Sequence, residues 1–125
     1  MYDICVVTGT RAEYGVLKPL LSRLNKSGLI DLKLVVTGSH LSENFGNTQD
    51  EIIADGFSIY KKLFIPLDDD SKLGMTISAS VEMQCAAELF SKYIPDAIVL
   101  LGDRYEILSV ALAAFFAGIP IIHIS

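Results

Sequence analysis

The sequence lacks the features of several common protein classes. It contains only two cysteines, Cys5 and Cys85, which lie far apart and form no CxxC or Cys/His pattern, so neither a disulfide framework nor a zinc site is expected. There are 10 Lys and Arg against 15 Asp and Glu, and the formal net charge of −5 argues against binding to a nucleic-acid backbone. We therefore expect two reduced, buried cysteines and no nucleic-acid partner.

Targeting and membrane signals are also missing. The chain begins Met1-Tyr2-Asp3, without the basic start and small-residue cleavage site of a secretory signal, so we predict a cytoplasmic location. The most apolar stretch, residues 107–122, is shorter than the roughly 20 residues that a membrane helix needs, and Gly118 and Pro120 interrupt it. We expect no association with a membrane.

What is present is the composition of a globular protein. Hydrophobic residues make up 51% of the 125 residues, which is enough for a buried core and too much for a disordered tail. Compact domains cluster at roughly 100–150 residues, so a chain of this length fits one domain. We therefore expect a single domain over residues 1–125.

Short apolar runs alternate with segments of helical character. The runs predict strands over residues 4–7, 32–36, 57–65, 97–101 and 119–124. The segments between them predict helices over residues 17–24, 48–54, 81–93 and 107–115. Because parallel strands need crossover connections, this order predicts an α/β fold, a Rossmann-like, doubly wound parallel sheet with helices on both faces.

A polar loop follows the first predicted strand, at the edge where such sheets bind ligands. Residues 9–15, GTRAEYG, can turn backbone N–H groups and the guanidinium of Arg11 toward a diphosphate. The loop is neither a GxGxxG nor a Walker A sequence, and no acid that could hold an NAD ribose ends the second strand, which argues against NAD and ATP. Gly9 and Gly15 as simple turn residues, with Arg11 paired to Glu13, fit the spacing equally well.

Two further loops should lie on the same rim. After the fourth strand, Asp103 could act as a general base or hold a sugar hydroxyl, and Arg104 could bind phosphate. Alternatively, Asp103 caps the next helix and Glu106 completes a capping box, and the two roles can coexist. In the loop after the second strand, His40 could contact a ligand. His123, inside an apolar strand, is expected to be a buried core histidine.

Five sequence blocks resemble the hydrolysing UDP-N-acetylglucosamine 2-epimerases and occur in the order seen in that family. They are GTRAEYG at 9–15, VTGSHLS at 36–42, FGNT at 45–48, LGDRYE at 101–106 and IPIIHI at 119–124. The first block is similar to that of the bacterial enzymes of sialic acid synthesis and differs from the Arg-Pro-Glu form of the non-hydrolysing 2-epimerases. The resemblance covers the whole chain.

The resemblance implies a reaction and roles for individual residues. UDP would be eliminated from UDP-N-acetylglucosamine, and water would add to the 2-acetamidoglucal intermediate to give N-acetylmannosamine, without a metal or redox cofactor. Arg11 would contact the diphosphate and Asp103 would be one of the acid/base carboxylates. We expect Arg104, His40 and Glu106 to be substrate-binding residues.

The resemblance also implies an architecture larger than this chain. Residues 1–125 would be the first half of a GT-B-like fold, whose active site lies between two Rossmann-like halves. The family's Gly-Gly-Glu segment, further acids and uridine-binding second domain are absent from these residues, so we expect the chain alone to be inactive, and the enzyme to be a homo-oligomer. Alternatives are a non-catalytic nucleotide-sugar-binding module, a 2-epimerase of a UDP-diacetamido sugar, and a Rossmann oxidoreductase.

Overall fold

The computed structural model describes residues 1–41, 48–65 and 71–125. The strands are β1 (Tyr2–Thr8), β2 (Ile30–Thr37), β3 (Ile59–Leu63), β4 (Ala97–Leu101) and β5 (Ile121–Ile124). The helices are α1 (Arg11–Lys26), the 3₁₀ helix η1 (Gly38–Leu41), α2 (Gln49–Ala54), α3 (Lys72–Lys92) and α4 (Tyr105–Phe116). The end of the 36–42 block, most of the 45–48 block and residues 66–70, which include three consecutive aspartates, lie outside the described residues.

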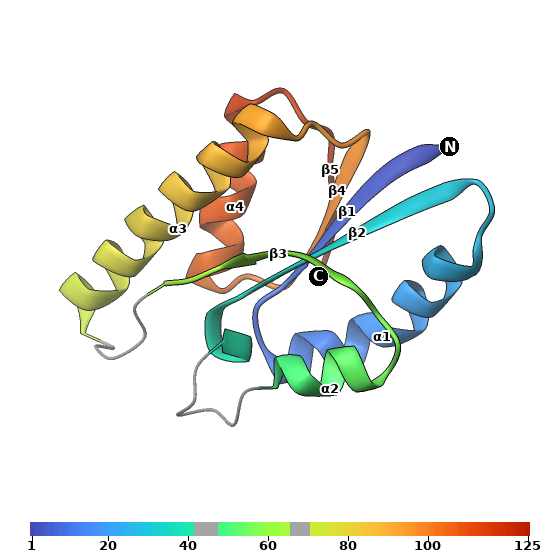
Figure 1. Ribbon diagram of the computed structural model, residues 1–125. Helices are drawn as coiled ribbons and strands as arrows, with labels where there is room; N and C mark the ends of the chain where they lie inside the picture. The colour runs from blue at the N-terminus through green and yellow to red at the C-terminus, as the bar shows by residue number, and fades with distance from the viewer. Residues whose placement is uncertain (42–47, 66–70) are drawn as a thin grey trace.

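The strands form one parallel sheet in the order β3-β2-β1-β4-β5. Helices α1 and α2 lie on one side of the sheet, and α3 and α4 lie on the other (Figure 1). The predicted α/β, doubly wound fold is therefore confirmed. Strand order reverses between β1 and β4, and the loops that follow these two strands border the crevice in which such folds bind ligands.

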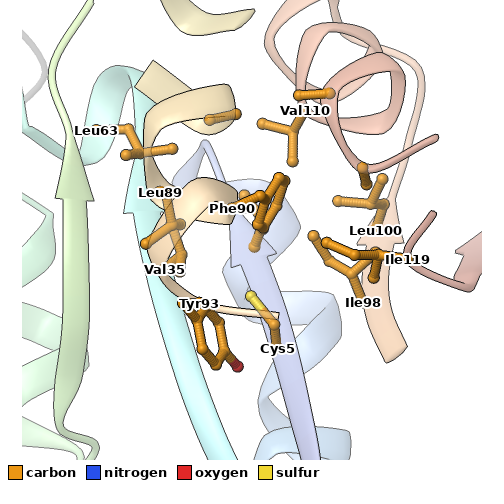
Figure 2. Close-up of a cluster of buried hydrophobic side chains, with 14 of the residues drawn as sticks. Cys5, Val35, Leu63, Leu89, Phe90, Tyr93, Ile98, Leu100, Val110 and Ile119 are labelled. Carbon is orange, nitrogen blue, oxygen red and sulfur yellow. The ribbon is translucent and has the colours of Figure 1, made fainter. Parts of the chain in front are cut away.

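Each face of the sheet has its own hydrophobic core. Side chains of a strand alternate between the two faces, so Cys5 and Val7 of β1 pack toward α3 and α4, while Val6 packs toward α1. Figure 2 shows the first of these clusters, in which Phe90 of α3 and Val110 of α4 meet the central strands. Burial on both faces explains why residues 4–7 of β1 and the whole of β4 are apolar and were predictable as strands.

The buried face of α3 agrees with the sequence pattern over one half of the helix only. Spacing predicts a buried stripe of Val81, Cys85, Leu89 and Tyr93; Leu89 and Tyr93 are buried, whereas Val81 and Cys85 are only half-buried and Glu82 and Ala86, one residue along, are buried instead. A polar side chain therefore occupies part of the buried face. The expectation of two buried cysteines is accordingly right for Cys5 and wrong for Cys85, and both are free thiols. No helix in the described part of the chain is long and apolar enough to cross a membrane.

Candidate functional site

Three glycine-bearing loops meet where β1, β2 and β4 end. Gly38 (φ 64°) and Gly102 (φ 89°) have left-handed backbone conformations that favour glycine. A Cβ atom on Gly38 would lie 2.6 Å from the carbonyl oxygen of Gly9, and one on Gly9 would lie 3.2 Å from the side chain of Glu106. The loops can therefore approach each other closely at the switch point, around the carboxylate of Glu106.

Arg11 is placed on this rim by the start of α1. The hydroxyl of Thr10 accepts the backbone N–H of Glu13 at 3.1 Å and caps the helix, so that Arg11 is the first helical residue. Its partner is Glu51 of α2, at 3.0 Å, and not Glu13, so the predicted alternative pairing is wrong. The Arg11 side chain is 73% exposed, and an ion pair this exposed stabilises by only about 0–1 kcal/mol, so a ligand can replace it.

Asp103 does not cap α4. The N-cap residue is Arg104, no side chain makes a capping hydrogen bond, and Glu106 is engaged elsewhere, so the predicted capping box is wrong. Asp103 is exposed and lines a hollow of about 290 Å³ together with Gly102, His123 and apolar residues of α4 and β5. Its side chain is thus open to the rim instead of being used by the helix. Arg11 does not line this hollow.

Arg104 and Glu106 form an ion pair at the mouth of the crevice. The Nε atom of Arg104 donates to Oε1 of Glu106 at 2.6 Å, and this contact is the main cause that raises the pKa of Arg104. The carboxylate is 1% exposed and the guanidinium side chain is 51% exposed. Glu106 therefore holds Arg104 from below, while the charged end of Arg104 reaches solvent.

Two more buried acids surround this pair. Glu13 accepts the backbone N–H of Gly9 at 2.9 Å, and burial, with the negative charge of Glu106, raises the pKa of Glu13. Glu82, on α3, was not singled out by the sequence reasoning; burial, with the charge of Glu106, raises its pKa to about 7. The signal available was the four-residue spacing that puts Glu82 in line with buried Ala86 and Phe90 on one face of α3.

Thr37 is the hydrogen-bond partner of Glu82. The Thr37 hydroxyl lies 2.8 Å from the carbonyl oxygen of Leu63 and donates to Oε2 of Glu82 at 2.7 Å, so its single proton is shared between two acceptors. The hydrogen bond from Thr37 lowers the pKa of Glu82, so the raised value comes from burial and from the charge of Glu106.

The two histidines are placed differently from expectation. His40 belongs to η1, is fully buried, and its ring nitrogens lie 3.0 Å and 2.7 Å from the hydroxyls of Thr8 and Thr48. Burial lowers the pKa of His40 to about 4, so the ring is neutral at pH 7. His123 is exposed, and its Nε2 atom lies 2.7 Å from the carbonyl oxygen of Gly102, so the predicted core position is wrong. Among the described residues, β5 pairs with a strand on one side only.

The site thus places Glu106 against the Gly9 loop after β1 and pairs it with Arg104, while Asp103 in the same loop after β4 faces the hollow beside β5 and Arg11 lies at the start of α1. Within residues 1–41, 48–65 and 71–125, no group of three or more His, Cys, Asp or Glu side chains could hold a metal ion. The guanidinium of Arg104 is suited to binding an anionic group, and the exposed carboxylate of Asp103 is suited to transferring a proton next to it.

Comparison with known proteins identifies the family. The sequence matches the UDP-N-acetylglucosamine 2-epimerase family over residues 22–125. The chain belongs to this family. It is 44% identical over 124 residues to the polysialic acid biosynthesis protein P7 of Escherichia coli, an alignment that covers 99% of this chain. It is 42% identical over 121 residues to the UDP-N,N'-diacetylbacillosamine 2-epimerase (hydrolyzing) of Legionella pneumophila, which covers 97% of the chain.

Solved structures of 2-epimerases share the fold. The crystal structure of the Methanocaldococcus jannaschii UDP-GlcNAc 2-epimerase in complex with UDP-GlcNAc and UDP matches with a TM-score of 0.80 at 25% identity, covering 97% of this chain and 32% of that one. The two curated relatives are also covered over only 32% of their length, so the chain spans about a third of the proteins that it matches. The resemblance seen in the sequence blocks is confirmed for the family and for the fold.

Proposed function

We propose that this chain forms one side of the active site of a hydrolysing 2-epimerase that acts on a UDP-2-acetamido sugar. The observation that carries the proposal lies at the switch point. There the buried carboxylate of Glu106 holds Arg104, and the neighbouring Asp103 is exposed and does not cap the helix. A pinned guanidinium suits the diphosphate of a UDP-sugar, and a free carboxylate next to it suits proton transfer on the sugar. Membership of the epimerase family supports the same assignment.

The proposed reaction has two steps. In the first, a base removes the proton from C2 of the sugar while the C1–O bond breaks and UDP leaves, giving a 2-acetamidoglucal. In the second, water adds its oxygen to C1 and a proton returns to C2 from the other face, which inverts that centre. UDP-N-acetylglucosamine and water thus give N-acetylmannosamine and UDP. Asp103 serves as one of the acid/base carboxylates, and Arg11 and Arg104 bind the diphosphate.

The rest of the cleft lies outside the described residues in this proposal. Residues 1–125 act as the N-terminal Rossmann-like domain of a GT-B-like enzyme, and a second domain supplies the uridine site and further acids. The chain's coverage of about a third of its relatives supports this division. A homo-oligomeric assembly stays a prediction, which light scattering on the purified full-length protein checks.

The experiment that tests this proposal identifies the sugar product and measures whether C2 of that sugar takes up a proton from the solvent. The protein encoded by the full reading frame containing this chain is incubated with UDP-N-acetylglucosamine in D₂O, and the expected products are UDP and N-acetylmannosamine with deuterium at C2. NAD serves as a control ligand and should not bind. UDP-sugar binding without any product would favour the non-catalytic binding module, and a lack of UDP-sugar binding would contradict both proposals.

A second substrate has its own support. The Legionella relative is named for UDP-N,N'-diacetylbacillosamine, which carries a second acetamido group, whereas the Escherichia coli relative is named for polysialic acid biosynthesis. Both sugars share the diphosphate and the acetamido group at C2, so the rim described above serves either. A comparison of kcat/KM for the two UDP-sugars decides which one the enzyme uses.

A further inference from the structure

Glu106 uses its two carboxylate oxygens unequally. Oε1 accepts the Nε–H of Arg104 at 2.6 Å, whereas Oε2 is buried and has no hydrogen-bond partner among the described residues. With 1% of its side chain exposed, Glu106 has no surface to offer a substrate. The expectation that Glu106 binds the substrate directly therefore does not fit its geometry, and its contact with Arg104 is the route by which it can act.

The ion pair leaves the two outer nitrogens of Arg104 available. Within the described residues, the hydrogen bonds of Arg104 involve Nε alone, and the side chain is 51% exposed. The guanidinium carbon also lies 6.0 Å from the ring centre of Tyr105, which limits its movement on a second side. A guanidinium held at Nε presents its paired Nη groups outward, and that pair matches two oxygens of a phosphate.

Stability gives a poor reason for this arrangement. Burying a carboxylate costs desolvation free energy, which the ion pair often does not offset. Two further buried acids, Glu13 and Glu82, lie close enough for the charge of Glu106 to raise the pKa of each. The Gly9 loop also packs directly on the side chain of Glu106, because a Cβ on Gly9 would lie 3.2 Å from it. A hydrophobic residue in place of Glu106 would avoid the desolvation penalty and the repulsion between the acids.

We propose that Glu106 is a positioning residue, which orients Arg104 through Nε so that both Nη groups face the diphosphate of the nucleotide sugar. The inference rests on the proposed function, because it takes the diphosphate to be the ligand of Arg104. It assigns no contact between Glu106 and the substrate. Glu106 fixes the orientation of the guanidinium of Arg104, which an exposed arginine would otherwise change freely.

A double-mutant cycle on UDP affinity tests the inference in the protein encoded by the full reading frame. A charge-assisted hydrogen bond contributes about 1.5–3 kcal/mol, so we expect Arg104→Ala to weaken UDP binding about 10- to 100-fold. Glu106→Ala should weaken binding about tenfold in the parent and not at all in the Arg104→Ala background, because it acts only through Arg104. Glu106→Gln keeps an oxygen that accepts the Nε–H and should restore most of the affinity. Glu82→Gln, which alters a buried acid without a hydrogen bond to Arg104, is the matched control and should bind UDP as the parent does.

Each other outcome counts against a specific claim. Equal losses from Glu106→Ala in both backgrounds, or no loss in the parent, overturn the positioning role while the proposed function stands. A parent protein that does not bind UDP overturns the proposed function itself. If Glu106→Ala does not fold, Arg104→Lys replaces it: lysine keeps the charge but lacks the fork, so we expect a loss of at least about tenfold, and parental affinity would overturn the inference.

Discussion

Asp103 is the residue whose role changes most between the sequence and the structure. The capping alternative predicted from its spacing to Glu106 is ruled out, because α4 begins at Tyr105 with Arg104 as its N-cap residue. Its chemical role can therefore be tested without a change in helix capping. An exposed carboxylate at the rim is a suitable acid or base, and its amide counterpart has nearly the same shape.

We expect Asp103→Asn to lower kcat of the full-length protein by at least about a hundredfold, because general acid–base groups contribute about 10²–10⁴ in rate. UDP affinity and thermal stability should stay close to those of the parent, since Asp103 makes no capping bond. The measurements are UDP release, UDP titration and thermal unfolding on the same preparation. A folded variant that releases UDP at nearly the parental rate would remove Asp103 from the mechanism.

Glu82 should make stability depend on pH. Its pKa is raised from 4.5 to about 7, so between these values the folded chain keeps a proton that the unfolded chain has lost. Stability therefore falls as pH rises from 4.5 to about 7, by on the order of 3 kcal/mol in total. Buried His40, with its pKa lowered to about 4, acts in the opposite direction, so only a difference between variants isolates Glu82.

Urea unfolding at pH 5 and pH 8 measures that difference. The glutamine of Glu82→Gln carries no charge at either pH, so this variant should gain stability relative to the parent between pH 5 and pH 8. Glu88→Gln, at an exposed position of the same helix, is the control and should show the same pH dependence as the parent. A parallel pH dependence of the parent and the Glu82→Gln variant would mean that Glu82 is ionised throughout.

At the scale of elements, the rim depends on the close approach of the β1 and β2 loops. Gly38 and Gly56 both have positive φ, 64° and 93°, but only at Gly38 would a Cβ meet backbone, 2.6 Å from the Gly9 carbonyl oxygen. We expect Gly56→Ala to cost about 1 kcal/mol from backbone strain alone and Gly38→Ala to cost at least about 3 kcal/mol. Denaturant midpoints for the two variants check this, and equal losses would show that the loops can move apart.

The elements also show what sequence reasoning can reach. Residues 4–7 of β1 and the whole of β4 were predictable as strands because burial on both faces makes them apolar without interruption, and the order of the elements placed the three loops on one rim. The first half of the buried face of α3 was misplaced, because Glu82 occupies a core position and contacts Thr37. That contact joins residues 45 positions apart, and no local pattern indicates it.

At the scale of the whole molecule, the proposed cleft needs more than these 125 residues. We expect the chain alone to turn over UDP-N-acetylglucosamine at a negligible rate, because catalysis of this kind depends on positioning and on exclusion of water from a closed site. The full-length protein assayed in parallel is the control. Release of N-acetylmannosamine by the isolated chain at a rate comparable with that control would contradict the two-domain proposal.

The site as a whole was predictable in outline only. The sequence blocks and the strand order indicated where Arg11, Asp103 and Arg104 would lie, and the family resemblance suggested their roles. The pairing of Arg104 with Glu106, the full burial of His40 and the exposure of His123 depend on tertiary packing. Side chains at a strand end or helix start have several directions open to them, and only the neighbouring elements select one.

The strand order has a consequence for how this domain folds. Residues 2–63 supply β3, β2 and β1, and residues 72–124 supply β4 and β5, so each side of the sheet is one continuous stretch of chain. The two stretches join through the pairing of β1 with β4, at the ends of which the ligand rim lies. Contacts within each stretch are more local in sequence, and therefore favoured early in folding, than those that join the stretches. We therefore expect the rim to be among the last parts of the domain to form. A ligand bound there would contact both stretches and lower the rate at which they separate during unfolding.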